Sequence, residues 1–181
     1  MSEANSLKIE GNEAFRAKKY FDAFDLYSKA LSKCDQGETE LLVSIYLNLS
    51  VTELFLERTS EAIDHASAAI ELDPKNVKAY YRRAQAKVQS LDLEGGYSDY
   101  VKALKINPSE KRIRQEAENT RAIIKRRDYL KALAKQDGDS VQNIEKKEYV
   151  PKPANIEIPE FNKEYAMEMI ENLKKDIRPH M

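Results

Sequence analysis

Apolar side chains recur at intervals of three and four residues through about residue 135, a spacing that places them on one face of an α-helix. The second such segment shows it with Phe21, Phe24, Leu26, Tyr27 and Leu31. The chain has only 5 glycines and is rich in Ala, Leu, Glu and Lys, which favour helices. The pattern predicts seven helices, over residues 4–17, 20–33, 40–57, 60–72, 77–90, 93–106 and 109–135.

The predicted helices repeat with a period of 34 residues. Ala69 and Ala103 are separated by this interval. Pro74 and Pro108 are separated by the same interval, and each proline ends the second helix of a pair because it cannot continue it. The frame extends back to the first helix once an insertion at 38–42 is allowed, which we expect to add a turn to the next helix. The frame defines three units, 4–37, 43–76 and 77–110.

Small residues occupy positions 8, 20 and 27 of every unit, where they let two antiparallel helices approach closely. They are Gly11, Ala23 and Ala30, then Ser50, Ala62 and Ala69, then Ala84, Gly96 and Ala103. A 34-residue period with such contacts predicts an all-α stack of helical hairpins rather than a globular enzyme core.

This pattern resembles the tetratricopeptide repeat family over residues 4–135. The resemblance implies a domain of residues 4–136, with three helical hairpins in a right-handed α-solenoid. The last predicted helix, 109–135, is expected to cap the stack, because it carries one apolar stripe on an otherwise charged surface. The stripe consists of Ile113, Ala117, Ile124 and Leu130.

Composition narrows the function classes. The 181 residues have a net charge of −1, so the whole chain lacks the basic signature of a nucleic-acid-binding protein. Cys34 is the single cysteine, which excludes an internal disulfide and fits a reducing compartment. The sequence contains no run of 18 apolar residues, so no membrane span is expected. The first residues lack a signal-peptide pattern. We therefore expect a cytoplasmic location, with the nucleus as a second one.

No catalytic arrangement stands out in the sequence. Gly11-Asn12-Glu13 lies in a predicted helix and lacks the histidine that a metallophosphatase places after its Gly-Asn. His65 has no second histidine or cysteine nearby, which disfavours a metal site. Neither a nucleophile with a base nor a phosphate-binding loop is recognisable. We therefore expect no enzyme activity, cofactor or metal in this chain.

The candidate binding residues lie on the first helix of each pair, which lines the concave surface in the tetratricopeptide fold. Positions 2, 5, 6 and 9 are spaced so that they share one helical face. That face carries three cations and two carboxamides with no acid among them, namely Lys8, Asn12, Asn48, Lys78 and Arg82. Such a set suits an anion with several oxygens, for example the two carboxylates of a peptide that ends in aspartate.

These five residues resemble the dicarboxylate clamp of chaperone-binding tetratricopeptide domains. The matching segments are 8–12, 46–50 and 78–84. The resemblance implies that the domain binds the C-terminal Glu-Glu-Val-Asp of heat-shock protein 90 or heat-shock protein 70. That interaction would make the chain a co-chaperone module.

The resemblance also implies a role for each residue. Lys8, Asn12 and Asn48 would hold the terminal carboxylate and the last residue. Lys78 and Arg82 would hold the aspartate side chain and neighbouring peptide groups. Three apolar residues at position 12 are either contacts for the peptide or core residues, namely Phe15, Leu54 and Val88.

Two other interpretations stay open at the level of the sequence. The cations could be ordinary solvated residues of a generic peptide-binding scaffold, which would tolerate a peptide with a blocked carboxyl terminus. The basic stretch 109–131 could contact an acidic ligand or a second chaperone surface, although a solvated face of a capping helix accounts for it more simply.

The last third of the chain differs in character. Asp137-Gly138-Asp139-Ser140 is predicted to break the capping helix, and three prolines then keep the chain extended, so residues 137–159 are predicted to be a linker. Residues 160–178 are predicted to form an amphipathic helix. Its apolar residues, spaced by four, are Phe161, Tyr165, Met169 and Leu173.

This layout resembles the protein phosphatase 5 family, in which a three-repeat clamp and a capping helix lead through a linker into a serine/threonine phosphatase domain. The resemblance implies a targeting and autoinhibitory module, an intramolecular phosphatase partner, and residues 160–178 as the start of a truncated phosphatase domain. The metal ligands of that domain have no counterpart here. The alternative is a clamp-type co-chaperone adaptor that is not linked to a phosphatase, which the insertion at 38–42 favours.

Overall fold

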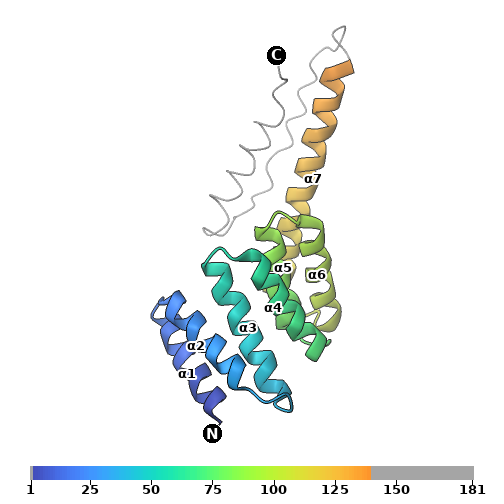
Figure 1. Ribbon diagram of the computed structural model, residues 1–181. Coiled ribbons are helices and arrows are strands. Elements are labelled where there is room, and N and C mark those ends of the chain that lie inside the picture. The colour runs from blue at the N-terminus through green and yellow to red at the C-terminus, as the bar shows by residue number, and fades with distance from the viewer. Residues whose placement is uncertain (1, 140–181) are drawn as a thin grey trace. The chain divides into compact units, whose positions relative to one another are not determined.

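The computed structural model describes residues 2–139, with side chains described through residue 133. This part is all helical, as the sequence predicts (Figure 1). Its helices are α1 (Glu3–Arg16), α2 (Tyr20–Lys33), α3 (Thr39–Phe55), α4 (Thr59–Leu72), α5 (Val77–Gln89), α6 (Leu93–Ile106) and α7 (Lys111–Asp139). The first six begin and end within two residues of the predicted limits.

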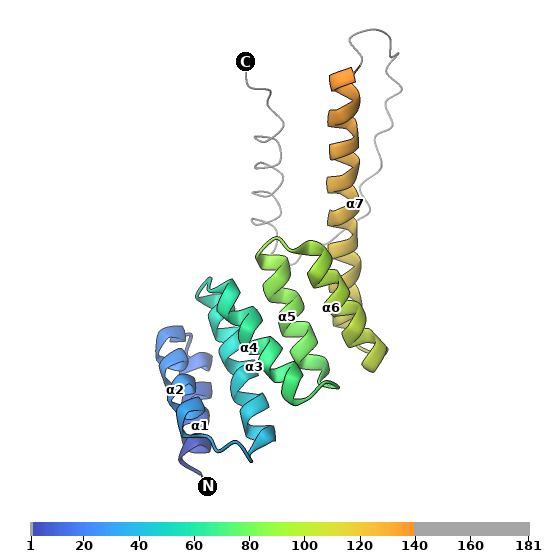
Figure 2. The ribbon, with the colours of Figure 1, turned by 45° about the vertical axis from the view of Figure 1, so that its right-hand side comes forward.

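The first six helices form three hairpins, because α1 packs on α2, α3 on α4 and α5 on α6. Contacts of α2 with α3 and of α4 with α5 join consecutive hairpins, and Figure 2 shows the pairs stacked in order. α3 has 17 residues, against 14 in α1 and 13 in α5, because the insertion at 38–42 adds a turn at its start. The predicted stack of three hairpins is thus confirmed.

The turn inside each hairpin has the same backbone geometry. Lys18, Glu57 and Leu91, at position 15 of their units, have φ values of 60°, 60° and 69°, in the left-handed region. In the first turn the amide of Lys19 donates to the carbonyl of Ala14 at 3.0 Å, and equivalent bonds close the other two turns. This Schellman arrangement ends the first helix and reverses the chain.

The small residues at positions 8, 20 and 27 lie where the helices meet, and all nine are buried. The close approach predicted from them is therefore confirmed. The prediction was wrong for Phe21. This residue belongs to the predicted apolar pattern of α2, but its side chain is 66% exposed. The helix instead buries Ala23, Tyr27 and Ala30, which face the neighbouring helices.

The first turns of α7 cover the last hairpin. Ile113 and Ala117 are each 5% exposed and pack in one buried cluster with Tyr81, Ala84 and Tyr100. Apolar surface that the third hairpin would otherwise expose is removed from water in this way. The predicted capping role of this part of α7 is thus confirmed.

The last helix ends later than predicted. α7 continues through Gly138 to Asp139, four residues beyond the predicted end, since a single glycine costs a helix only about 1 kcal/mol. The first residues of the predicted linker are therefore helical. Residues through Arg121 form one compact unit. The rest of the predicted linker, 140–159, and the predicted helix 160–178 lie outside the described residues.

Candidate functional site

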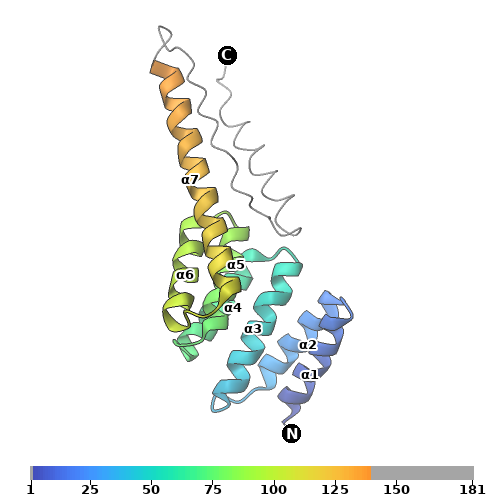
Figure 3. The same ribbon diagram turned by 180° about the vertical axis from the view of Figure 1, so that it is seen from behind.

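The predicted binding residues lie on three neighbouring helices. Lys8 and Asn12 belong to α1, Asn48 to α3, and Lys78 and Arg82 to α5. α3 contacts both α1 and α5, and Figure 3 shows it between them. The first helices of the hairpins thus form one surface, the first-helix wall, which carries all five residues. Its three candidate cations are Lys8, Lys78 and Arg82.

Asn12 and Asn48 are in direct contact across α1 and α3. The Nδ2 of Asn48 donates to Oδ1 of Asn12 at 2.9 Å. The hydroxyl of Tyr27, from α2, donates to the same oxygen at 2.8 Å. Because both lone pairs of Asn12 Oδ1 are used, its amide orientation is fixed and its Nδ2 stays available as a donor.

Tyr27 can reach Asn12 because Gly11 has no side chain. A Cβ at Gly11 would lie 2.6 Å from Cε1 of the Tyr27 ring, well inside van der Waals contact. Burial raises the pKa of Tyr27 to about 12, with the charge of Arg16 opposing it, so the phenol stays protonated and able to donate. A small residue of the repeat pattern thus helps to orient a candidate binding residue.

Arg82 is a half-buried cation whose hydrogen-bond partner is neutral. Its Nη1 donates to Oε1 of Gln85, one turn along α5, at 3.0 Å. Burial lowers the pKa of Arg82; the nearby Tyr81 opposes this effect and the positive charge of Arg112 adds to it. A cation in such surroundings favours an incoming carboxylate, because the ligand supplies the missing counter-charge.

Other cations of α5 are paired. Arg83 donates through Nε and Nη2 to both carboxylate oxygens of Asp99, at 2.7 and 2.9 Å, and Lys87 Nζ lies 2.9 Å from Oδ2. Burial alone would raise the pKa of Asp99, but hydrogen bonds and charge from Arg83 and Lys87 hold it below its ordinary value. Within the described residues, by contrast, none of the three candidate cations forms an ion pair.

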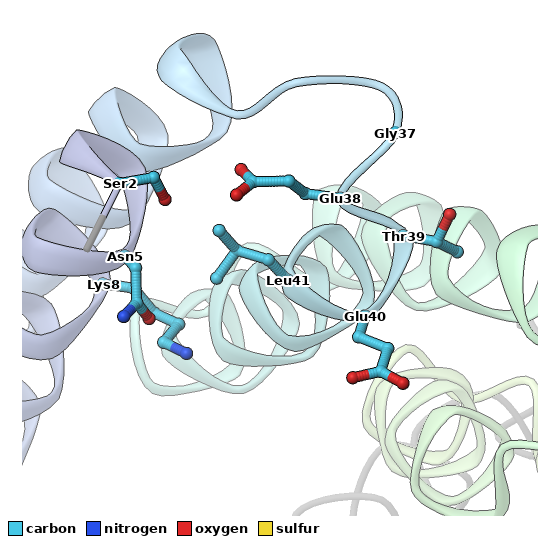
Figure 4. A pocket seen from close by; sticks show the side chains of 8 residues that line it. All are labelled: Ser2, Asn5, Lys8, Gly37, Glu38, Thr39, Glu40 and Leu41. Carbon is cyan, nitrogen blue, oxygen red and sulfur yellow. The ribbon is translucent and has the colours of Figure 1, made fainter.

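Lys8 lines a cleft of about 710 Å³ at one end of the wall (Figure 4). Asn5 of α1 and the segment 37–41, which contains most of the insertion, complete the cleft together with Ser2. Glu38 and Glu40 of that segment line it as well. The insertion thus brings two carboxylates to the side of one candidate cation and lowers the net positive charge at this end of the wall.

All three apolar candidates pack against buried clusters, and one of them also belongs to an aromatic cluster that reaches the surface. Leu54 is 7% exposed and packs in a buried cluster, and Val88 packs against the core of the third hairpin. Phe15 packs against the core of the first hairpin and also meets the rings of Tyr20 and Phe55 edge-on, with centroids 5.4 and 5.5 Å away. Phe55 is 43% exposed, so this aromatic cluster reaches the surface one turn along α1 from the asparagine pair.

Tyr27 and Gln85 take part in the site although the sequence pattern does not identify them. Gln85 occupies position 9 of the third unit, where Asn12 stands in the first, so the repeat register contains a signal for it. Tyr27 lies on the second helix of its hairpin, outside the register of first-helix residues. Its role becomes visible only from the packing of α2 on α1.

His65 has an acidic partner inside the fold. Its Nδ1 lies 2.7 Å from Oε2 of Glu53, which is 1% exposed. Among the described residues, no three His, Cys, Asp or Glu side chains are grouped to hold a metal ion. In the same part of the chain, no helix is both long and apolar enough to cross a membrane.

Residues 43–76 match the tetratricopeptide repeat family, and these are the same residues that the 34-residue frame assigns to the second unit. The chain contains a tetratricopeptide repeat. The family resemblance drawn from the sequence is thereby confirmed, and helices α1–α6 supply the three helical hairpins of that fold.

This tetratricopeptide chain is similar to parts of longer proteins. It is 32% identical over 177 residues to DnaJ homolog subfamily C member 7 homolog from Dictyostelium discoideum, covering 93% of the chain and 32% of that protein. It is 35% identical over 147 residues to Hsp70/Hsp90 co-chaperone CNS1 from Saccharomyces cerevisiae, covering 80% of the chain and 37% of that protein. It is 30% identical over 177 residues to serine/threonine-protein phosphatase 5 from Homo sapiens, covering 98% of the chain and 33% of that protein. The chain thus spans about a third of the length of these relatives.

Solved tetratricopeptide domains share the fold. The first domain of Spaghetti (RPAP3), bound to the HSP90 peptide SRMEEVD, is 26% identical with a TM-score of 0.61, over 67% of this chain and 93% of that one. The second domain of human RPAP3, in complex with the HSP70 peptide SGPTIEEVD, is 26% identical with a TM-score of 0.58, over 65% and 94%. Both peptides end in Glu-Glu-Val-Asp.

Proposed function

We propose that this tetratricopeptide repeat domain binds the C-terminal Glu-Glu-Val-Asp tail of heat-shock protein 90 or heat-shock protein 70. The observation that carries the proposal is the absence of a carboxylate partner for the candidate cations in the part of the chain that the structure describes. The three candidate cations of the first-helix wall have no carboxylate partner within the described residues, whereas Arg83 and Lys87 share Asp99. Similarity to two domains whose structures contain such peptides supports the same ligand.

The donors on the wall match two carboxylates at the end of a peptide. Lys8, together with the amide donors of Asn12 and Asn48, suits the terminal carboxylate. Lys78 and Arg82, one turn apart on α5, suit the side chain of the last aspartate. Because the asparagine pair is already oriented, little side-chain freedom is lost there when the peptide binds.

An apolar contact accompanies the carboxylate contacts in this proposal. The aromatic cluster of Phe15, Tyr20 and Phe55 lies beside the asparagine pair and is partly exposed. We assign Phe15 to an apolar side chain of the peptide. Leu54 and Val88 act through core packing instead, since they pack in the core clusters and are not part of this exposed aromatic cluster.

Calorimetric titration with Met-Glu-Glu-Val-Asp tests the proposal. We expect micromolar binding, about −8 kcal/mol, and no binding of the C-terminally amidated peptide. Arg82→Ala should abolish measurable binding, since losing one partner of a desolvated charge pair costs about 2–5 kcal/mol. Lys78→Ala should weaken binding. Lys29→Ala, which changes another exposed lysine, on α2, should leave binding unchanged. Equal binding of the free and amidated peptides would contradict the clamp and favour a generic scaffold.

We further propose that the domain serves as the targeting and autoinhibitory module of a phosphatase 5-like protein in the cytoplasm or nucleus. Similarity to serine/threonine-protein phosphatase 5 supports this proposal. An adaptor without a phosphatase is the second candidate, favoured by the higher identity to co-chaperone CNS1. Phosphatase activity of the natural full-length protein, measured with and without the tail peptide, separates them. Phosphatase activity that rises when the peptide is added supports the autoinhibitory module. Absence of phosphatase activity supports the adaptor.

A further inference from the structure

The first turns of α7 continue the register of the first-helix wall. α7 begins at Lys111, 34 residues after the start of α5 at Val77. Arg112 therefore takes the position that Lys78 holds in α5. Ile113, which is 5% exposed, packs into the core of the third hairpin and fixes the rotation of this part of α7. The start of α7 thus continues the repeat register of α1, α3 and α5, and Arg112 is a further cation in that register.

The guanidinium groups of Arg112 and Arg82 both lie close to one aromatic ring. The guanidinium carbon of Arg112 lies 5.5 Å from the centroid of Tyr81, and that of Arg82 lies 5.7 Å from the same centroid. Tyr81 is itself 8% exposed, so its buried ring is a rigid support that both cations approach. Its hydroxyl is buried and makes no hydrogen bond of good geometry within the described residues, and the guanidinium of Arg112 lies close enough to interact with it.

The two arginines lack a full counter-charge. Neither forms an ion pair within the described part of the chain. The carboxyl group nearest in the register is that of Glu116, one turn after Arg112 on α7. Burial raises the pKa of Glu116, and the charge of Arg112 only partly opposes this effect. The fold therefore holds two like charges near each other beside a carboxylate that burial destabilises, and an external anion would relieve their repulsion.

We propose that Arg112, together with Arg82 and the Tyr81 ring, forms a second anion subsite that binds an acidic side chain of the peptide upstream of its last two residues. The inference rests on the proposed tail binding and adds a preference for acidic tails. Arg112 is then a specificity-determining residue, and Glu116 is an internal competitor for the same subsite.

The test compares two peptides on matched variants. Met-Glu-Glu-Val-Asp and Met-Gln-Gln-Val-Asp are titrated into the wild type, Arg112→Gln and Arg114→Gln. Arg114 is the control because it lies two residues further along α7, about 200° around the helix, and donates to the carbonyl of Pro108. Arg112→Gln should weaken binding of the glutamate peptide about two- to fivefold, the range of an exposed ion pair, and leave the glutamine peptide unchanged. Arg114→Gln should change neither.

A variant that is expected to gain affinity separates loss of the subsite from loss of the fold. Glu116→Gln should tighten binding of Met-Glu-Glu-Val-Asp by about twofold or more, because it removes the competing carboxylate. Glu118→Gln, which changes an exposed carboxylate on the same helix, should have no effect. Thermal unfolding of each variant, followed by circular dichroism, confirms that the fold is retained.

The outcomes separate the two proposals. Failure of the wild type to bind either peptide overturns both the tail-binding function and the subsite. Wild-type binding that Arg82→Ala abolishes but Arg112→Gln leaves unchanged overturns the subsite alone. Equal weakening of both peptides by Arg112→Gln also overturns it, because the loss would then not depend on the acidic side chains.

Discussion

Arg82 and Arg83 are adjacent in the sequence and have opposite electrostatic surroundings. Arg83 makes two hydrogen bonds to the buried carboxylate of Asp99 on α6, whereas Arg82 donates to the neutral Gln85 on its own helix. Consecutive helical residues are turned by about 100°, so one arginine meets the second helix of the hairpin and the other stays on the first-helix wall. The first stabilises the fold, and the second is available to a ligand.

Stability measurements should separate the two arginines. Arg83→Ala removes a partner of the buried Asp99 and should lower the free energy of unfolding by about 3 kcal/mol. Arg82→Ala breaks no ion pair within the described residues and should lower it by no more than about 1 kcal/mol. Urea denaturation of both variants measures the difference. An equal loss from the two substitutions would contradict the division of roles.

Acid should remove the contribution of Asp99. Its pKa is lower in the folded state than in the unfolded state, so the unfolded state binds more protons between the two values. The stabilisation is therefore complete above about pH 4, the ordinary range of an aspartate, and is lost as the pH falls through the folded-state value. Arg83, Lys87 and Lys102 are the cations that face this carboxylate.

The matched variant for this pH effect is Asp99→Asn. Urea denaturation of the wild type and the variant between pH 2 and pH 6 should show a smaller loss of stability on acidification for the variant. Parallel curves for the two proteins would show that Asp99 does not contribute to the acid sensitivity.

Gly11→Ala should affect both the fold and the site. The new Cβ would collide with the Tyr27 ring, and overpacking of this kind costs about 1–3 kcal/mol, against a gain of about 1 kcal/mol in helix propensity. Displacing Tyr27 also releases Asn12, so peptide affinity should fall. Gly37→Ala is the control for the effect on the fold, because a Cβ there meets nothing within 4 Å. Unchanged affinity in Gly11→Ala would show that the orientation of Asn12 does not depend on Tyr27.

Two tyrosine-to-phenylalanine substitutions should have opposite effects. Tyr81→Phe removes a buried hydroxyl that makes no hydrogen bond of good geometry in the described residues, with only the charge of Arg112 beside it, and should stabilise the protein by about 1 kcal/mol. Tyr27→Phe removes the hydrogen bond to Asn12 and should destabilise it by about 1 kcal/mol. Thermal unfolding of both variants tests the pair. Destabilisation by Tyr81→Phe would show that its hydroxyl has a partner in solution.

The repeat pattern predicted the helices because their determinants are local. Small residues at fixed positions, helix-favouring composition and two prolines set the first six helices within two residues of their observed limits. The end of α7 was the least accurate prediction among the described helices, because Gly138 is a weak breaker inside an otherwise favourable segment. Phe21 shows the limit of periodicity, since which apolar residues of α2 are buried depends on its neighbours.

The sequence alone determined which residues stand on the first-helix wall, because helical periodicity and the 34-residue frame depend only on residue order. It could not determine which of them are free to bind. Packing of α6 against α5 pairs Arg83 with Asp99, and packing of α2 against α1 brings Tyr27 to Asn12. These contacts join residues on different helices, so only the tertiary structure separates the cations that stabilise the fold from those left for a ligand.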